Sequence, residues 1–207
     1  MRKRWWWLPV AAAALMSADV RAIVEPLTRS DIERALAVAR WPRTDADRAR
    51  FHSRYVFNFE EAPIDYWIVT RLEVLTAFRR IELMAEAHTS DLWGRGGIND
   101  VERDIRPWSG RVSIVAHLSL RSDRPYIGGV PQVDVLLDGP DPPTSIELRR
   151  TEQLANCGGN LKGCPVVGGT VEAIFAARAV GQVTRSIAAV WNGRVLARAT
   201  VDFSALD

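Results

Sequence analysis

Two closely spaced cysteines are the residues of this chain with the most obvious potential for chemistry. Cys157 and Cys164 are its only cysteines, and they bracket the glycine-rich segment NCGGNLKGC. Six residues separate them, whereas a thioredoxin-like redox pair is separated by two and a structural zinc site needs four close ligands. A P-loop would need Ser or Thr after Lys162, where this chain has Gly163. The spacing therefore favours a structural disulfide between Cys157 and Cys164, with an exchanging thiol pair as the alternative, and no metal site is predicted.

A histidine followed by several carboxylates could supply acid–base catalysis. His52 precedes Glu60, Glu61 and Asp65, and a nearby carboxylate can hold an imidazole pKa close to neutrality. Nothing in their spacing requires them to meet, so a solvated acidic turn is the favoured interpretation. The nucleophile motifs G-x-S-x-G and S-x-x-K and the zinc motif H-E-x-x-H are absent. The sequence thus shows no recognisable catalytic constellation and predicts no cofactor.

Three aromatic residues are candidates for a binding surface. Tyr66 and Trp67 follow an acidic, proline-containing turn, and Tyr126 lies in the expected loop between two strands. Loops at one end of a sheet often carry binding residues. Burial in the core is the favoured alternative for these rings, because large aromatic side chains are mostly buried in a domain of this size.

The N-terminal segment has the features of a cleaved signal peptide. A basic start precedes an apolar run, 5–16, that is shorter than the roughly 20 residues a membrane-spanning helix needs. The small-x-small pattern Val20-Arg21-Ala22 predicts cleavage after Ala22, with Ala18 as the alternative site. We therefore expect residues 1–22 to be removed, the mature chain to be periplasmic or secreted, and no stable membrane span to remain.

The charge balance argues against nucleic-acid binding. The whole chain has 27 basic and 25 acidic residues, and the predicted signal peptide contains more bases than acids. The mature chain is therefore close to neutral, and it has no basic run interleaved with aromatic residues. A possible partner is another envelope protein.

The first half of the mature chain contains helix signals. Ser30 and Glu33 have capping-box spacing at the start of a helix predicted over 31–40. The apolar period predicts a second helix over 77–87, and Asn99 begins a short third one that Pro107 limits. Between them, the alternation over 68–74 predicts a strand.

From Arg111 onward the chain alternates apolar and polar residues in short stretches separated by turns. Asn192-Gly193 is the strongest hairpin signal, because both residues tolerate the positive φ of a type I′ turn. We therefore predict an α+β fold, with short N-terminal helices followed by an antiparallel β-sandwich or open-barrel-like sheet. Segments 23–110 and 111–207 are expected to form one domain.

These features predict an exported bacterial envelope protein that acts as a non-catalytic binding or interaction module. The missing motifs, the neutral mature chain and the β-rich second half favour this class over an enzyme. The alternative is a small periplasmic hydrolase that uses His52 with a nearby carboxylate.

Overall fold

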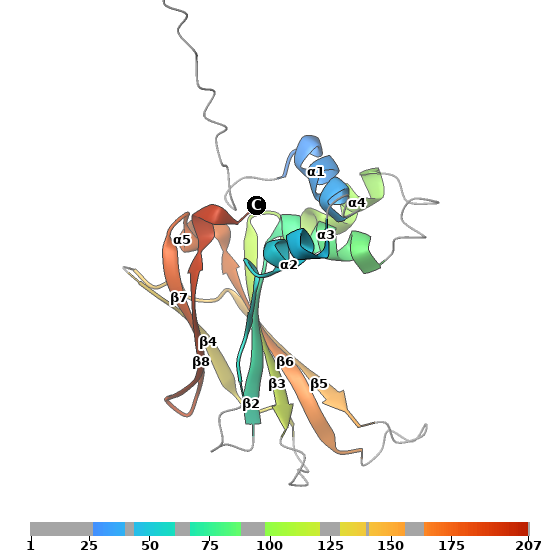
Figure 1. Ribbon diagram of the computed structural model, residues 1–207. Coiled ribbons are helices and arrows are strands. Elements are labelled where there is room, and N and C mark those ends of the chain that lie inside the picture. Colours follow the sequence, from blue (N-terminus) through green and yellow to red (C-terminus); the bar gives the residue numbers. More distant parts are fainter. Residues whose placement is uncertain are drawn as a thin grey trace, which may run out of the picture.

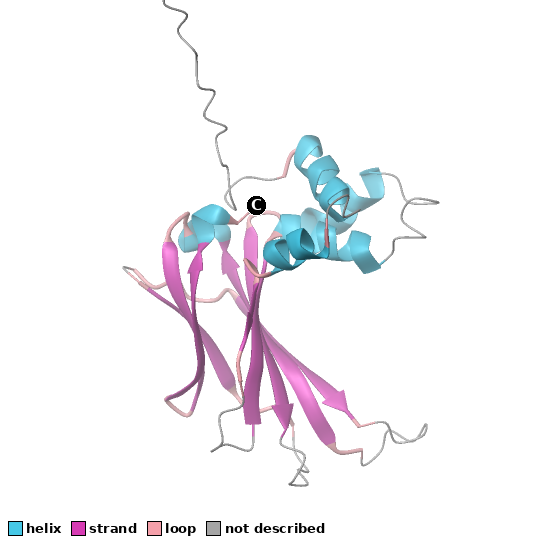
Figure 2. Ribbon diagram, viewed as in Figure 1, coloured by secondary structure: helices cyan, strands magenta, loops and turns pink. Residues whose placement is uncertain are grey.

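The computed structural model describes residues 27–39, 44–60, 67–87, 98–120, 129–139, 141–155 and 164–206. These residues form five α-helices and eight strands, and the strands pair antiparallel in two sheets (Figures 1 and 2). The predicted α+β class is therefore confirmed. The predicted signal peptide and the segment 156–163 lie outside the described residues.

The larger sheet has five strands in the order β1-β2-β3-β6-β5. The strands are β1 (Val56–Asn58), β2 (Trp67–Leu75), β3 (Arg111–Leu120), β6 (Val166–Ala176) and β5 (Glu147–Leu154). The smaller sheet has the order β4-β7-β8, with β4 (Val133–Asp138), β7 (Thr184–Trp191) and β8 (Arg194–Asp202). Strands β1 and β2 come from the helix-rich first half and pair with the second half through β3.

One hydrophobic core lies between the two sheets. Alternation along β3 sends Val112, Ile114 and Ala116 into it, and Leu137 of β4 and Ile187 of β7 enter it from the other sheet. The two sheets therefore form a β-sandwich around shared apolar side chains. On the other face of the larger sheet, β3 places Ser113, His117 and Ser119 together with Val115.

The hairpin between β7 and β8 has the predicted turn. Asn192 and Gly193 have φ values of 49° and 75°, so both lie in the left-handed region that a type I′ turn requires. The Asn-Gly prediction is confirmed.

Four helices lie at one end of the sandwich (Figure 1). They are α1 (Arg29–Ala39), α2 (Asp45–His52), α3 (Ala77–Ala87) and α4 (Ile98–Ile105). The short α5 (Ala177–Val180) joins β6 to β7, and two 3-10 helices span Arg106–Trp108 and Phe203–Ala205. A second apolar cluster holds α1, α3 and α4 together, and Phe51 of α2 packs against both clusters.

The first helix is capped by a different pair from the one predicted. The backbone N–H of Thr28 donates to the Asp31 carboxylate at 2.9 Å, and the Asp31 N–H donates to the Thr28 hydroxyl at 3.3 Å. Thr28 and Asp31 therefore form the capping box, and the prediction of Ser30 with Glu33 is wrong. Helix α1 starts at Arg29, and its apolar residues belong to the cluster that it shares with α3.

None of the described helices is both long enough and apolar enough to cross a bilayer.

Candidate functional site

A polar groove crosses the face of the larger sheet that points away from the sandwich core. One pocket of about 440 Å³ touches all five strands, and another of about 540 Å³ lies where α2 and α3 meet β1 and β2. Asn58 and Arg71 line both pockets, so the two adjoin. The groove therefore runs from the helices to the edge strand β5.

Hydroxyl and amide groups dominate the part of the groove that lies over the strands. Its lining includes Asn58, Thr70, Ser119, Thr151, Gln153 and Thr170. Arg71 and His117 add a cation and an imidazole. Such a surface can donate and accept many hydrogen bonds.

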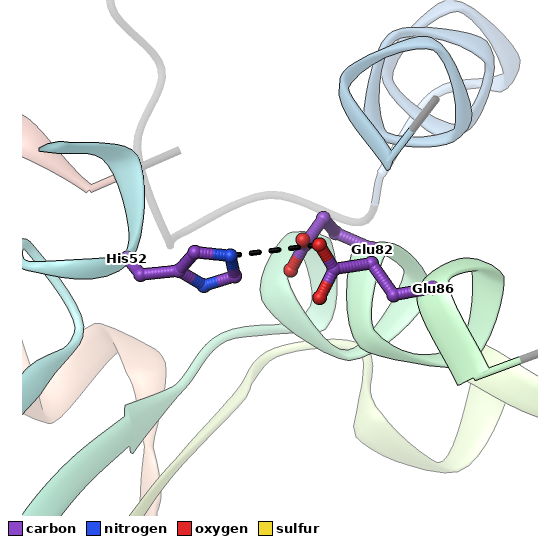
Figure 3. Close-up of side chains that lie close together, drawn as sticks. All are labelled: His52, Glu82 and Glu86. Carbon is purple, nitrogen blue, oxygen red and sulfur yellow. Dashed lines mark ion pairs between the residues drawn. The ribbon is translucent and has the colours of Figure 1, made fainter. Parts of the chain in front are cut away.

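His52 lies at the helical end of the groove and faces two carboxylates of α3 (Figure 3). Its Nε2 is 3.5 Å from Oε1 of Glu86, and Arg48 contacts the same oxygen at 3.0 Å. Burial and the positive charge of Arg79 lower the pKa of His52, and Glu86 only partly opposes them. The imidazole is therefore neutral at neutral pH and can accept a proton.

A buried ion pair lies behind His52. Arg79 and Glu82 are 2% and 0% exposed, and Nη1 of Arg79 makes a short contact with Oε2 of Glu82. Burial, aided by the charge of Glu86, raises the pKa of Glu82 to about 7, although Arg79 opposes this shift. Oε1 of Glu82 has no hydrogen-bond partner among the described residues. Glu82 is thus a carboxyl group that titrates near neutrality inside the protein.

Arg79 links this pair to a second group of charges on β2 and β3. Its Nη2 is 3.8 Å from Glu73, and Glu73 also lies 3.2 Å from Nε2 of His117. Arg71 Nη2 is 3.2 Å from the ring nitrogens of His117. Although burial opposes it, the hydrogen bond from His117 and the charges of Arg71 and Arg79 lower the pKa of Glu73. A chain of polar contacts therefore extends from Glu82 through Arg79 and Glu73 to His117.

Three of these residues could offer ligands to a metal ion. One ligand atom each from His52, Glu82 and Glu86 lies within 4.8 Å of the other two. Arg48 already pairs with Glu86 and Arg79 with Glu82, so a dication would have to compete with two guanidinium groups. The charges therefore fit an ion-pair network better than a metal site.

The structure gives His52 a carboxylate partner that the sequence analysis did not consider. Glu86 contacts His52, whereas the exposed Glu60 follows β1 and none of the described ion pairs joins it to His52. Glu61 and Asp65 lie outside the described residues. Helix α3 thus supplies the acid that the loop was considered to provide.

Among the aromatic and cysteine candidates, the structure describes Trp67 and Cys164. Trp67 is 1% exposed in the sandwich core, so it is a core residue and not part of a binding surface. Tyr66 and Tyr126 lie outside the described residues. Cys164 precedes β6 and is not a free thiol. Because Cys157 also lies outside the described residues, its pairing with Cys164 stays a prediction.

The apolar period that predicts the helix over 77–87 does not reveal that Arg79 and Glu82 on that helix are buried. Only Thr76 separates β2 from α3, so the helix must fold back close to the end of the sheet. That short connection is the signal that could have placed Arg79 and Glu82 near Glu73.

Comparisons with family models, with curated proteins and with solved structures find no match to this chain.

Proposed function

We propose that the chain is an exported bacterial envelope protein and a non-catalytic binding module, with its ligand in the groove on the larger sheet. The observation that carries the proposal is the pair of adjoining pockets, which share Asn58 and Arg71 and cross five strands. Their lining is rich in hydroxyl and amide groups, and the Arg71 side chain is 41% exposed. A polar, oxygen-rich ligand matches this lining.

Charge pairing in the groove supports binding over catalysis. Glu73, His117, Arg79 and Glu86 all have protein partners at short distances, so they hold one another in place. Such paired groups make a rigid floor for a ligand, because their orientation is set before the ligand arrives.

Binding can be tested on oligosaccharide and peptide arrays with the fluorescently labelled mature protein. We expect selective capture of members of one array, and at least about a tenfold loss of affinity for Arg71→Ala. Arg178→Ala, which removes an exposed arginine of α5 far from the groove, serves as the control and should bind normally. Failure to bind either array, or equal binding by Arg71→Ala, would contradict the proposal.

Export and the disulfide are parts of the same proposal and need a separate measurement. In a Gram-negative host, the mature mass should begin at Ile23, and alkylation under denaturing conditions without reductant should add no label. A full-length mass with two alkylated cysteines would contradict both.

The alternative is a small periplasmic hydrolase in which His52 acts as a general base. It is favoured by one observation: a neutral His52 lies 3.5 Å from Glu86 beside a pocket of about 540 Å³. His52 would take a proton from a water molecule, and Glu86 would stabilise the imidazolium that forms. A panel of chromogenic esters, phosphates and glycosides tests this alternative. Turnover that His52→Ala abolishes while His117→Ala retains it would replace the binding proposal.

A further inference from the structure

Strand β5 is a long edge strand, and most of its side chains are exposed. It pairs with β6 and comes last in the order of the larger sheet, so no described strand lies on its other side. Every residue over 149–154 is exposed. The strand contains no proline, and edges of this kind can pair with another chain.

The pairing of β5 with β6 fixes which side chains share a face. Arg150 lies opposite Val171, and Leu148 lies opposite Ala173, both core residues of β6. Leu148, Arg150 and Glu152 therefore share the core side of the sheet, and Arg149, Thr151 and Gln153 share the groove side.

A two-fold axis perpendicular to the sheet would allow two copies of β5 to pair antiparallel and make one continuous sheet. Such an axis keeps each face on its own side, so residues that lie opposite each other must belong to the same face. The axis must then lie midway between the two copies of one residue, so that this residue is opposite itself. This condition leaves few registers for a strand as short as β5.

One of these registers is complementary in charge. With the axis at Thr151, Arg150 lies opposite Glu152 of the second copy, and this pair occurs twice because of the symmetry. The same register places Arg149 opposite Gln153 and Leu148 opposite Leu154. Arg150 and Glu152 take part in none of the ion pairs among the described residues, and the Glu152 carboxylate lies beside Gly129.

The neighbouring registers are repulsive. Moving the axis to Arg150 places two arginines opposite each other, and moving it to Glu152 does the same with two glutamates. Like charges directly opposite are destabilising in antiparallel pairs. The charges of Arg150 and Glu152 therefore disfavour the two neighbouring registers and favour the register with the axis at Thr151.

We propose that a second copy of this chain pairs with β5 about a two-fold axis at Thr151, which gives a continuous ten-stranded sheet. The interface is one strand wide, so the dimer is weak and depends on concentration. Thr151 and Gln153 also line the groove, so pairing would bring two grooves together along one sheet.

Sedimentation velocity over the micromolar range tests the proposal with charge reversals. Wild type should dimerise as concentration rises, and Arg150→Glu and Glu152→Arg should each weaken dimerisation by at least about tenfold. The double reversal should restore it, because each pair again has opposite charges. Arg178→Glu makes the same charge change on α5 and should leave the dimer unchanged.

Cysteine cross-linking locates the axis independently of charge. Directly opposed residues of an antiparallel pair have Cα atoms about 4.5–5.5 Å apart, within the range that a disulfide bridges. Thr151→Cys should therefore form a covalent dimer under mild oxidation, whereas Arg150→Cys and Glu152→Cys should not. The proposal would be overturned if the wild type stays monomeric at all concentrations, or if neither charge reversal weakens the dimer. Cross-linking at residue 150 or 152 in place of 151 would also overturn it.

Discussion

Arg79 is the residue whose removal should damage the site most. Its guanidinium is buried, pairs with Glu82 and Glu73, and lies 5.3 Å from the ring centre of Tyr55. Because the charge of Arg79 lowers the pKa of Glu82, Arg79→Met would leave a carboxyl group that must take up a proton to stay buried at neutral pH, and we expect a loss of about 3–5 kcal/mol in the free energy of unfolding, measured with urea at neutral pH.

Two further variants separate lost charge pairing from lost packing. Arg50→Met removes an exposed arginine from a surface pair with Asp47 and should cost less than about 1 kcal/mol. The double variant Arg79→Met, Glu82→Gln should lose less than Arg79→Met alone, because the glutamine amide is neutral without binding a proton. Equal losses for the single and double variants would show that Arg79 acts mainly through packing.

Glu82 should give the protein a distinctive pH dependence. Its folded-state pKa of about 7 is above the ordinary 4.5, so between these values the folded protein binds more protons than the unfolded chain. Stability from this group is therefore fully present below about pH 4.5 and declines as pH rises through 7. His52, whose pKa is lowered, acts in the opposite direction below 6.5, so the comparison must be made with a Glu82 variant.

We expect Glu82→Gln to lose stability relative to wild type at about pH 5 and to recover much of that difference by about pH 8, a relative change of order 2 kcal/mol. Urea denaturation at several pH values measures it. Arg79 and Glu86 face this carboxyl, Glu73 contacts Arg79, and all three are present in both proteins. Parallel pH profiles for the two proteins would contradict the raised pKa.

Residue types alone identified His52 as a candidate but could not identify its partner. Glu60 and Glu61 were candidate partners because they are close to His52 along the chain. Glu86 meets His52 because α2 packs beside α3, and that packing is a tertiary feature that no local spacing encodes. The same limit applies to His117, which reaches Glu73 only through the pairing of β2 with β3.

At the scale of elements, the start of α1 can be tested directly. Two capping-box patterns overlap in the sequence, one from Thr28 to Asp31 and one from Ser30 to Glu33, and the structure uses the first. Thr28→Ala should therefore cost about 1 kcal/mol in thermal or urea denaturation, because the N–H of Asp31 loses its acceptor. Ser30→Ala, at an exposed position within the helix, is the matched control and should be nearly neutral. A larger loss of stability for Ser30→Ala than for Thr28→Ala would show that Ser30 is the cap.

Elements with a strong local signal were predictable, and those set by packing were not. The helix over 77–87 and the Asn192-Gly193 turn follow from apolar period and backbone preference, and both match the structure. The choice between the overlapping caps does not follow from residue type, because each pairs a hydroxyl residue with an acid three positions later.

At the scale of the molecule, the two halves of the chain contribute to one sheet. Strand β2, from the helix-rich half, pairs with β3 over most of its length and sends Leu72 and Val74 into the core between the sheets. The sequence could not show whether 23–110 and 111–207 share a core, because β2 and β3, the two strands that join these segments, lie far apart along the chain. The second cluster, around α1, α3 and α4, remains distinct from that core.

Phe51 connects the two clusters, so its truncation tests whether they unfold together. Its ring packs against both, lies 5.3 Å from the ring of Tyr55, and is close to the buried guanidinium of Arg79. Since β2 also runs into α3 through Thr76 alone, we expect one cooperative unit. Phe51→Ala should lower the protection of amides in α3 and β3 by the same free energy, about 2 kcal/mol, in hydrogen exchange read by mass spectrometry. If α3 loses protection while β3 retains it, the helices unfold as a separate unit, and the groove between α2, α3 and the sheet would open without loss of the sandwich.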